Sequence, residues 1–216
     1  MTVSRGRFIT VEGIEGAGKS SNLEFIRHLL EASGKEVLFT REPGGTPLGE
    51  EVRNLLLGHR HTGMADDTEL LLMFAARAEN LEQKIRPALE AGIWVLCDRF
   101  TDASYAYQGG GRGIDMQRIQ MLEEWTQREL RPDLTILLDL PVEVGLERAG
   151  KRSEPDRFEK EEVRFFEAVR QAYLQIAWDQ AERVKLVDAS TPLYEVQARV
   201  ADVMHDFIQK IADHHP

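Results

Sequence analysis

The sequence predicts an α/β fold: one parallel five-stranded sheet with helices on both faces. Short apolar runs alternate with amphipathic segments along the 216 residues, and the first run stops at a glycine-rich loop. Strands that alternate with helices pair in parallel, because each crossover helix returns the chain to the same end of the sheet. No repeat, low-complexity tract or linker interrupts the chain. We therefore expect one domain over residues 1–216.

Each expected strand is a short run of apolar and β-branched residues, and the five runs cover 7–12, 35–41, 93–98, 134–139 and 184–188. Leu23, Ile26 and Leu30 follow the first run at helical spacing, before a glycine stop at Gly34. Further helices are expected over 48–57, over 67–92, and before and after each of the last two strands. The polar segment 149–157, "AGKRSEPDR", is expected to form a lid between helices.

Composition excludes several classes of protein. The net charge of −10 argues against a general nucleic-acid binder, because a duplex would be repelled. Cys97 is the single cysteine, so no disulfide framework is predicted. No apolar run approaches the roughly 20 residues that span a bilayer, and no signal peptide opens the chain. We expect a cytoplasmic protein with neither a membrane nor a nucleic-acid partner.

The stretch from Gly13 to Ser20 has the pattern G-x-x-x-x-G-K-S, between the first strand and the first helix. Phosphate oxygens need converging backbone N–H groups, and glycines allow that approach. The helix adds its positive N-terminus, Lys19 can reach the β and γ phosphates, and the Ser20 hydroxyl can hold Mg²⁺. A turn that binds nothing is the alternative, but the strand–loop–helix context favours a nucleoside triphosphate. The expected binding residues are Gly13, Ile14, Glu15, Gly16, Ala17, Gly18, Lys19 and Ser20.

The third expected strand ends at Asp98, where a carboxylate beside such a loop can hold Mg²⁺ directly or through water. A helix-capping aspartate is the alternative. Arg99 next to it is suited to clamping a second phosphoryl group, which points to a phosphoryl acceptor.

Further arginines follow the expected strands. Arg41 ends the second strand, Arg53 lies on the next helix, and Arg77 falls on the apolar stripe that contains Phe74. A guanidinium on an apolar face must have a partner. An aromatic ring and a bidentate donor on one helix face would suit a planar heterocycle. An arginine bonded to a backbone carbonyl or an aspartate fits as well, and the residues alone leave both readings open.

Five stretches carry a specific resemblance: "VEGIEGAGKSS", "TREPGGTPLGEEVR", "LLMFAARAE", "DRFTDASYAYQGGGRG" and "RPDLTILLDLPVEVGLER". In this order and spacing, from about Phe8 to Ala189, they resemble the bacterial type of thymidylate kinase. That family transfers the γ-phosphate of ATP to dTMP with Mg²⁺, giving dTDP, a step in dTTP synthesis. The resemblance implies a P-loop nucleoside monophosphate kinase fold and a homodimer; the choice of ATP over GTP rests on it alone.

The resemblance also implies roles for the acceptor site. Glu15 would meet the sugar 3′-hydroxyl, Phe74 would stack on thymine, and Arg77 would bond the base carbonyl that cytosine lacks. Other residues would hold the acceptor phosphate (Arg41, Arg53, Arg99), pack under the sugar and exclude a 2′-hydroxyl (Tyr107), lie near the base edge (Ser104, Gln108), or form a cis peptide (Glu42–Pro43). The chain departs from the family where the stacking aromatic is expected four residues before the arginine, because Met73 stands there.

One branch of the family carries a P-loop arginine after the acidic residue, at the place of Gly16 here. The charge for the transferring phosphoryl group is then expected from the segment 149–157, with Arg152 and Arg157 as catalytic residues beside Lys19 and Arg99. Lys151 and Arg148 flank them, and Arg148 is expected at the donor nucleotide. A cation on a lid completes the site only when both substrates are bound. A solvated loop between two helices is the alternative.

Two other functions remain open. A kinase for another nucleoside monophosphate would differ only in its base pocket. A guanine-nucleotide switch or a P-loop binding module would share Gly13–Ser20, but the chain contains no N-K-x-D motif to read guanine.

Overall fold

The fold is built on a five-stranded parallel sheet, as expected, and its strand order is β2-β3-β1-β4-β5. The computed structural model describes residues 5–61, 63–151, 157–159 and 161–213. The strands are β1 (Phe8–Glu12), β2 (Val37–Arg41), β3 (Trp94–Asp98), β4 (Leu134–Asp139) and β5 (Val184–Asp188). In the central register, Val11 of β1 lies opposite Asp98 of β3 and Ile136 of β4. All five strands begin and end within two residues of their predicted positions.

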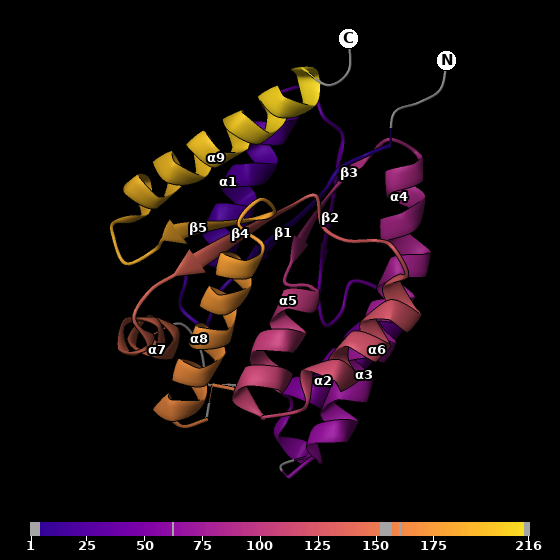
Figure 1. The fold of residues 1–216 in the computed structure, drawn as a ribbon, viewed down its shortest axis with the longest axis vertical. Coiled ribbons are helices and arrows are strands. Elements are labelled where there is room, and N and C mark those ends of the chain that lie inside the picture. The colour runs from indigo at the N-terminus through magenta and orange to yellow at the C-terminus, as the bar shows by residue number, and fades with distance from the viewer. Residues whose placement is uncertain (1–4, 62, 152–156, 160, 214–216) are drawn as a thin grey trace.

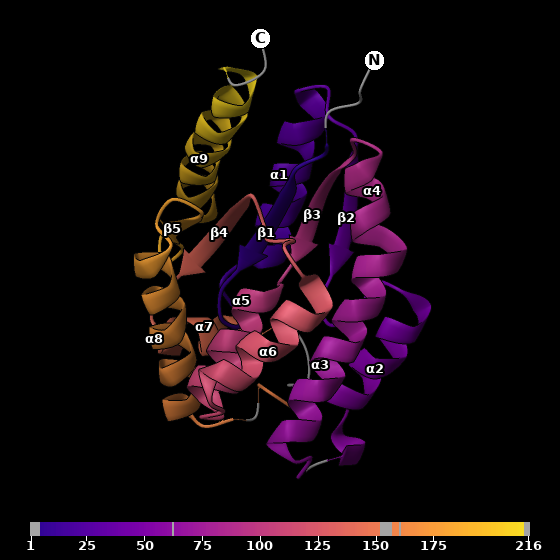
Figure 2. The ribbon, with the colours of Figure 1, turned by 45° about the vertical axis from the view of Figure 1, so that its right-hand side comes forward.

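Helices cover both faces of the sheet (Figures 1 and 2). On one face lie α1 (Lys19–Ala32) and α9 (Leu193–Asp213). On the other lie α4 (Arg86–Glu90) and α8 (Val163–Asp179). The remaining helices gather beyond the carboxyl ends of the strands: α2 (Pro47–Leu57), α3 (Asp66–Asn80), α5 (Thr101–Ser104), α6 (Met116–Gln127) and α7 (Val142–Gly150). Across the described residues, no helix is long and apolar enough to cross a membrane.

Two segments have the wider π-helical turn. Leu81–Ile85 joins α3 to α4, and Tyr105–Gly111 continues α5. The single helix expected over 67–92 is therefore three consecutive pieces. Pro87, in the first turn of α4, explains the interruption, because proline lacks an N–H and its ring clashes with the carbonyl four residues earlier. A short 3₁₀ turn, His59–His61, follows α2.

The core forms on both sides of β1, whose five residues are all buried. Ile9 packs into the cluster that contains the α1 side chains Leu23 and Ile26, whereas its neighbour Phe8 packs with Leu81 and other residues on the opposite side. Alternate burial of this kind is what a central parallel strand requires. The chain leaves β1 toward β2 and leaves the neighbouring strand β3 toward β4, in opposite directions, so the carboxyl ends of β1 and β3 form a switch point, where ligands bind in such sheets.

Candidate active site

The loop from Gly13 to Gly18 leaves β1 at this switch point and is shaped by glycine. Gly13, Gly16 and Gly18 have φ angles of 139°, 73° and 84°, which side chains rarely adopt. A Cβ on Gly16 would lie 1.9 Å from the carbonyl oxygen of Gly145 in α7, and a Cβ on Gly13 would lie 2.5 Å from that of Leu138. The loop backbone therefore packs directly on the end of β4 and on α7.

Lys19 lies over this loop. Its Nζ donates hydrogen bonds to the carbonyl oxygens of Gly13 and Ile14, both at 3.0 Å. Burial and, to a smaller extent, the positive charge of Arg99 lower the pKa of Lys19 to about 8, while Asp98 opposes the shift. The ammonium group is thus held at the place where the sequence predicts phosphate.

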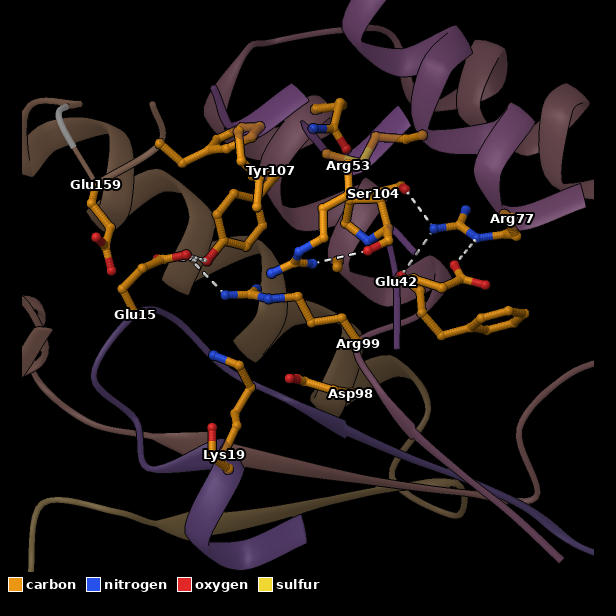
Figure 3. Close-up of a pocket in the computed structure, with 18 of the residues that line it drawn as sticks. Glu15, Lys19, Glu42, Arg53, Arg77, Asp98, Arg99, Ser104, Tyr107 and Glu159 are labelled. Carbon is orange, nitrogen blue, oxygen red and sulfur yellow. Dashed lines mark hydrogen bonds and ion pairs between the residues drawn. The ribbon is translucent and has the colours of Figure 1, made fainter. Parts of the chain in front are cut away.

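Asp98 and Ser20 line the same cleft as Lys19. Figure 3 shows Asp98 near Lys19. Asp98 Oδ1 is buried, and no hydrogen-bond partner is found for it within the described parts of the chain. Those parts also contain no group of three or more His, Cys, Asp or Glu side chains that could hold a metal alone. Mg²⁺ is commonly held by one or two protein ligands together with phosphates and water. The orphaned carboxylate oxygen beside the serine fits that arrangement.

Arg99 stands between the two ends of the cleft (Figure 3). Its Nη2 donates to Glu15 Oε1 at 2.9 Å, and the Tyr107 hydroxyl donates to the same carboxylate at 2.7 Å. The guanidinium carbon also lies 4.7 Å from the centre of the Tyr107 ring. Side chains from the P-loop, the end of β3 and the π segment therefore meet in one hydrogen-bonded group.

The backbone of Arg99 is held in an uncommon conformation, with φ 65°. Its N–H donates to the Val11 carbonyl at 3.0 Å, and the next N–H, that of Phe100, donates to Glu12 Oε1 at 2.6 Å. Burial raises the pKa of Glu12 to about 8, with a contribution from Asp102, while hydrogen bonds from Tyr173 and Phe100 oppose the rise. Sequence reasoning missed Glu12; the signal that could have found it was a carboxylate at the end of an otherwise uncharged strand.

Arg77 forms the far end of the cleft. Its Nε donates to Glu42 Oε2 at 2.6 Å, and its Nη2 donates to Ser104 Oγ at 3.0 Å. The guanidinium lies between the rings of Phe74 and Phe100, at 4.5 and 5.2 Å. Nη1 is buried, and the described residues provide no acceptor for it. Arg77 therefore has a buried carboxylate partner, while its Nη1 remains without an acceptor among the described residues. Burial raises the pKa of Glu42, and Arg77 opposes that rise.

Known proteins resemble this chain over almost its whole length. A family model described as thymidylate kinase matches residues 11–200. A thymidylate kinase of Pseudomonas entomophila is 58% identical over 95% of this chain and 98% of its own. One of Nitrosomonas europaea is 54% identical over 98% of both chains. The crystal structure of a thymidylate kinase from Ehrlichia chaffeensis has a TM-score of 0.76 at 32% identity, covering 93% of this chain and 99% of that one.

The chain belongs to the thymidylate kinase family. Its fold is accordingly the P-loop nucleoside monophosphate kinase fold that the resemblance implied. Most residues expected from the sequence pattern or from the family resemblance line one cleft, namely Glu15, Gly16, Gly18, Lys19, Ser20, Pro43, Arg53, Arg77, Asp98, Arg99, Ser104, Tyr107 and Gln108. Arg53 Nη1 donates to the Pro43 carbonyl at 2.9 Å, and Glu42–Pro43 is a cis peptide, as the family pattern predicts.

Phe74 is placed differently from the expectation. It is buried in a cluster with Leu70, Ile114 and Ile119, whereas Met73 lines the cleft. Both positions share a face of α3 with Arg77, and the packing of α3 against α6 turns Phe74 away from the cleft. The expected stacking of Phe74 on a base does not fit this position, and Met73 takes that place on the cleft wall.

Two more expected arginines have other partners. Arg41 is exposed and bonds Glu50 through Nε and Nη2, at 3.1 and 2.7 Å, and it does not line the cleft. Arg157 donates to Glu69 Oε2 at 2.5 Å and to the Leu56 carbonyl at 2.7 Å, so its guanidinium is occupied. These ion pairs satisfy both side chains without a phosphate. Arg152 lies outside the described residues.

A second groove adjoins the P-loop on the side of α9. Arg148 lines it and donates to the carbonyl oxygens of Ala189 and Ser190, at 2.8 and 3.1 Å. Ala17, Gly18 and Val196 line it too. Sequence analysis named Arg148 but missed the loop after β5. The run "DAST" at the carboxyl end of the last strand was the signal that could have indicated this loop. This groove is continuous with the P-loop through Gly18, which lines both hollows.

Proposed function

We propose that the protein transfers the γ-phosphate of ATP to dTMP, giving dTDP, as a step in dTTP synthesis. One observation carries the proposal: a single cleft holds Lys19 and Asp98 at one end and the free donor of Arg77 at the other, with Arg99 between them (Figure 3). The names of the relatives at 58% and 54% identity support it.

The donor end would hold the triphosphate. The loop N–H groups, the positive end of α1 and Lys19 would bind its β and γ phosphates. Ser20 and Asp98 would hold Mg²⁺, which supplies positive charge to the phosphate oxygens. The groove beside Arg148 and Val196 would receive the nucleoside of ATP.

The acceptor end would orient the monophosphate. Arg99 and Arg53 would hold its phosphate, and Glu15 with Tyr107 would meet the sugar. Arg77 Nη1 would donate to the base carbonyl that thymine has and cytosine lacks. Little covalent work is left to the protein in phosphoryl transfer, so these residues act by positioning and by charge stabilisation.

The segment 149–157 remains a proposed lid of this single domain, and Arg152 is the cation we propose for the transferring phosphoryl group. The contact of Gly16 with Gly145 supports a source outside the P-loop, because it leaves no room for a side chain there. Arg157 is already engaged by Glu69. Steady-state kinetics test whether Arg152, and not Arg157, supplies the catalytic charge. The kcat should fall in Arg152→Ala far more than in Arg157→Ala, and equal kcat values would contradict this assignment.

We propose that the enzyme works as a cytoplasmic homodimer. Exposed apolar side chains on three neighbouring helices support the dimer: Leu48 and Leu55 on α2, Leu71 on α3, and Met121 and Trp125 on α6. Sedimentation at micromolar concentration tests it, and a monomer there would contradict it. The cytoplasm is supported by the place of the reaction in dTTP synthesis.

The decisive experiment measures ADP release in a coupled assay with dTMP, dUMP, dCMP, UMP and AMP offered separately. We expect the fastest turnover with dTMP and little ATP consumption without an acceptor. Faster turnover with AMP or UMP would overturn the proposed substrate. ATP consumption that ignores every monophosphate would overturn the kinase.

A further inference from the structure

Glu69 is a buried carboxylate that does not line the cleft. It sits in the first turn of α3 with 1% of its surface exposed. It accepts hydrogen bonds from Gln108 Nε2 at 2.9 Å, from Arg112 Nε and Nη2 at 3.3 and 3.2 Å, and from Arg157 Nη2 at 2.5 Å. A buried charge needs such donors, and here they come from the π segment and from the chain before α8.

Gln108 connects this carboxylate to the cleft. Its side chain is buried, yet it forms part of the cleft wall. An ionised carboxylate only accepts hydrogen bonds, so the amide nitrogen of Gln108 must face Glu69. Throughout the described residues, no group donates to Gln108 Oε1. The amide oxygen is therefore the end of Gln108 that remains for a ligand.

The cleft then offers a donor and an acceptor from neighbouring elements. Arg77 Nη1 is the free donor, and Ser104, which binds Arg77 Nη2, lies one turn before Gln108. A base edge with a carbonyl next to a ring N–H matches this pair, as thymine and uracil do at O4 and N3. Cytosine has an amino group and an unprotonated ring nitrogen at these places. Its amino group would face the donor Arg77 Nη1, and its ring nitrogen would face the acceptor oxygen of Gln108, so neither contact would be a hydrogen bond.

We propose that Glu69 is a positioning residue for base selectivity, because it fixes the Gln108 amide with its oxygen toward the cleft as the acceptor for the base N3–H. This inference rests on the proposed function and deepens it. It makes the discrimination against cytosine depend on a carboxylate that never touches the substrate.

The variant Glu69→Gln tests the orientation. A glutamine at this position keeps its oxygen in the place of Oε2, which accepts from Arg112 Nη2 and Arg157 Nη2. Its NH₂ group then takes the place of Oε1 and faces Gln108, at the cost of the 3.3 Å contact with Arg112 Nε. Gln108 would then turn its own oxygen to that NH₂ and present its nitrogen to the cleft. Glu161→Gln is the matched control, because Glu161 Oε1 pairs with Arg112 Nη1 at 2.6 Å but does not contact Gln108.

Steady-state kinetics with dTMP, dUMP and dCMP give the readout. In Glu69→Gln the ratio of kcat/KM for dTMP over dCMP should fall at least 10-fold, mainly through the KM values. The ratio of dTMP over dUMP should stay unchanged, because those bases share one edge. Glu161→Gln should leave both ratios at the wild-type values.

A second variant keeps the test decisive if Glu69→Gln fails to fold. Gln108→Met removes the acceptor but leaves Glu69 with both arginines, and it should lower the same dTMP over dCMP ratio. In that background, Glu69→Gln should change the ratio no further. Folded variants that keep wild-type discrimination would overturn the inference. A wild type that does not prefer dTMP in the substrate panel would instead overturn the proposed function.

Discussion

The donor and acceptor ends of the cleft are built from different material. The donor end is the backbone of one continuous loop, Gly13–Gly18, packed against β4 and α7. The acceptor end consists of side chains from helices distant in sequence, held by buried ion pairs such as Arg77–Glu42 and Arg112–Glu69. A backbone site offers few side chains to exchange, whereas a side-chain site can change its ligand one residue at a time. The donor end should thus be general and the acceptor end selective.

The largest expected effect comes from removing the Lys19 side chain at the donor end. Lys19→Ala should lower kcat/KM by about 10³, or about 4 kcal/mol of transition-state stabilisation. The bonds of Lys19 to two loop carbonyls are few, so the free energy of unfolding should change by less than about 1 kcal/mol. Steady-state kinetics and urea denaturation measure the two quantities. Near-normal turnover in a folded variant would contradict the phosphate role of the loop.

Removing Arg77 from the acceptor end should lower both the stability of the protein and its affinity for dTMP. Arg77→Ala leaves Glu42 buried without its cation, which should cost about 3 kcal/mol of unfolding free energy and raise the KM for dTMP about 10-fold. Adding Glu42→Gln separates the two roles. We expect the double variant to regain most of the stability, measured by urea denaturation, while the KM for dTMP stays raised. Recovery of the KM as well would show that Arg77 acts only as a partner of Glu42.

The same contrast explains how far the sequence alone could go. The P-loop was predictable because its glycines, lysine and serine are contiguous, and a local pattern determines a local structure. At the acceptor end the sequence singled out arginines, but the roles of single side chains came only through a family resemblance, and the structure places Phe74 away from the cleft. Met73 and Phe74 share one face of α3, so only the packing of α3 against α6 decides which of them meets the cleft.

The partners of charged side chains at long range were not predictable from the sequence. Arg41 and Arg157 were expected at phosphates, and in the structure they pair with Glu50 and Glu69. The Glu69–Arg157 pair spans 88 positions in the sequence, and no periodicity connects residues that far apart. The inner strands β1, β3 and β4 were predicted correctly because burial on both faces gives each an almost continuous apolar run, and the edge strands β2 and β5, although partly exposed, are also mainly apolar.

A smaller effect concerns the close contact beneath the donor loop. Gly16→Ala would place a Cβ 1.9 Å from a backbone oxygen of Gly145, so loop and helix must separate. Gly34→Ala is the matched control, because Gly34 has a similar φ of 75° but nothing within 4 Å of its Cβ position. We expect about 1 kcal/mol of destabilisation in the control and about 2 kcal/mol more at Gly16, with a loss of ATP affinity. Equal losses in urea denaturation would mean that backbone conformation alone sets the need for glycine.

The smallest expected effect concerns Glu12, which lies between the donor end and the acceptor end of the cleft. It closes the strand that leads into the P-loop, and its carboxylate accepts from the N–H next to Arg99. Its pKa is about 8 in the folded protein, raised by burial and by Asp102, against an ordinary value of 4.5. Between these values the folded state holds a proton that the unfolded chain lacks, so the free energy of unfolding falls as the pH rises, by about 1.4 kcal/mol per unit at most.

Glu12→Gln removes this titration and imitates the protonated side chain, whose carbonyl oxygen can still accept from Phe100. The wild type should therefore lose about 1 kcal/mol more unfolding free energy than Glu12→Gln between pH 6.5 and 7.5, in urea titrations of both proteins. Turnover of the variant should persist at pH 6.5, because the neutral side chain already holds the backbone beside Arg99 there. Parallel stability curves would mean that Glu12 is ionised at neutral pH. The hydrogen bond from the Phe100 N–H to Glu12, which holds the backbone beside Arg99, would then involve a buried charge.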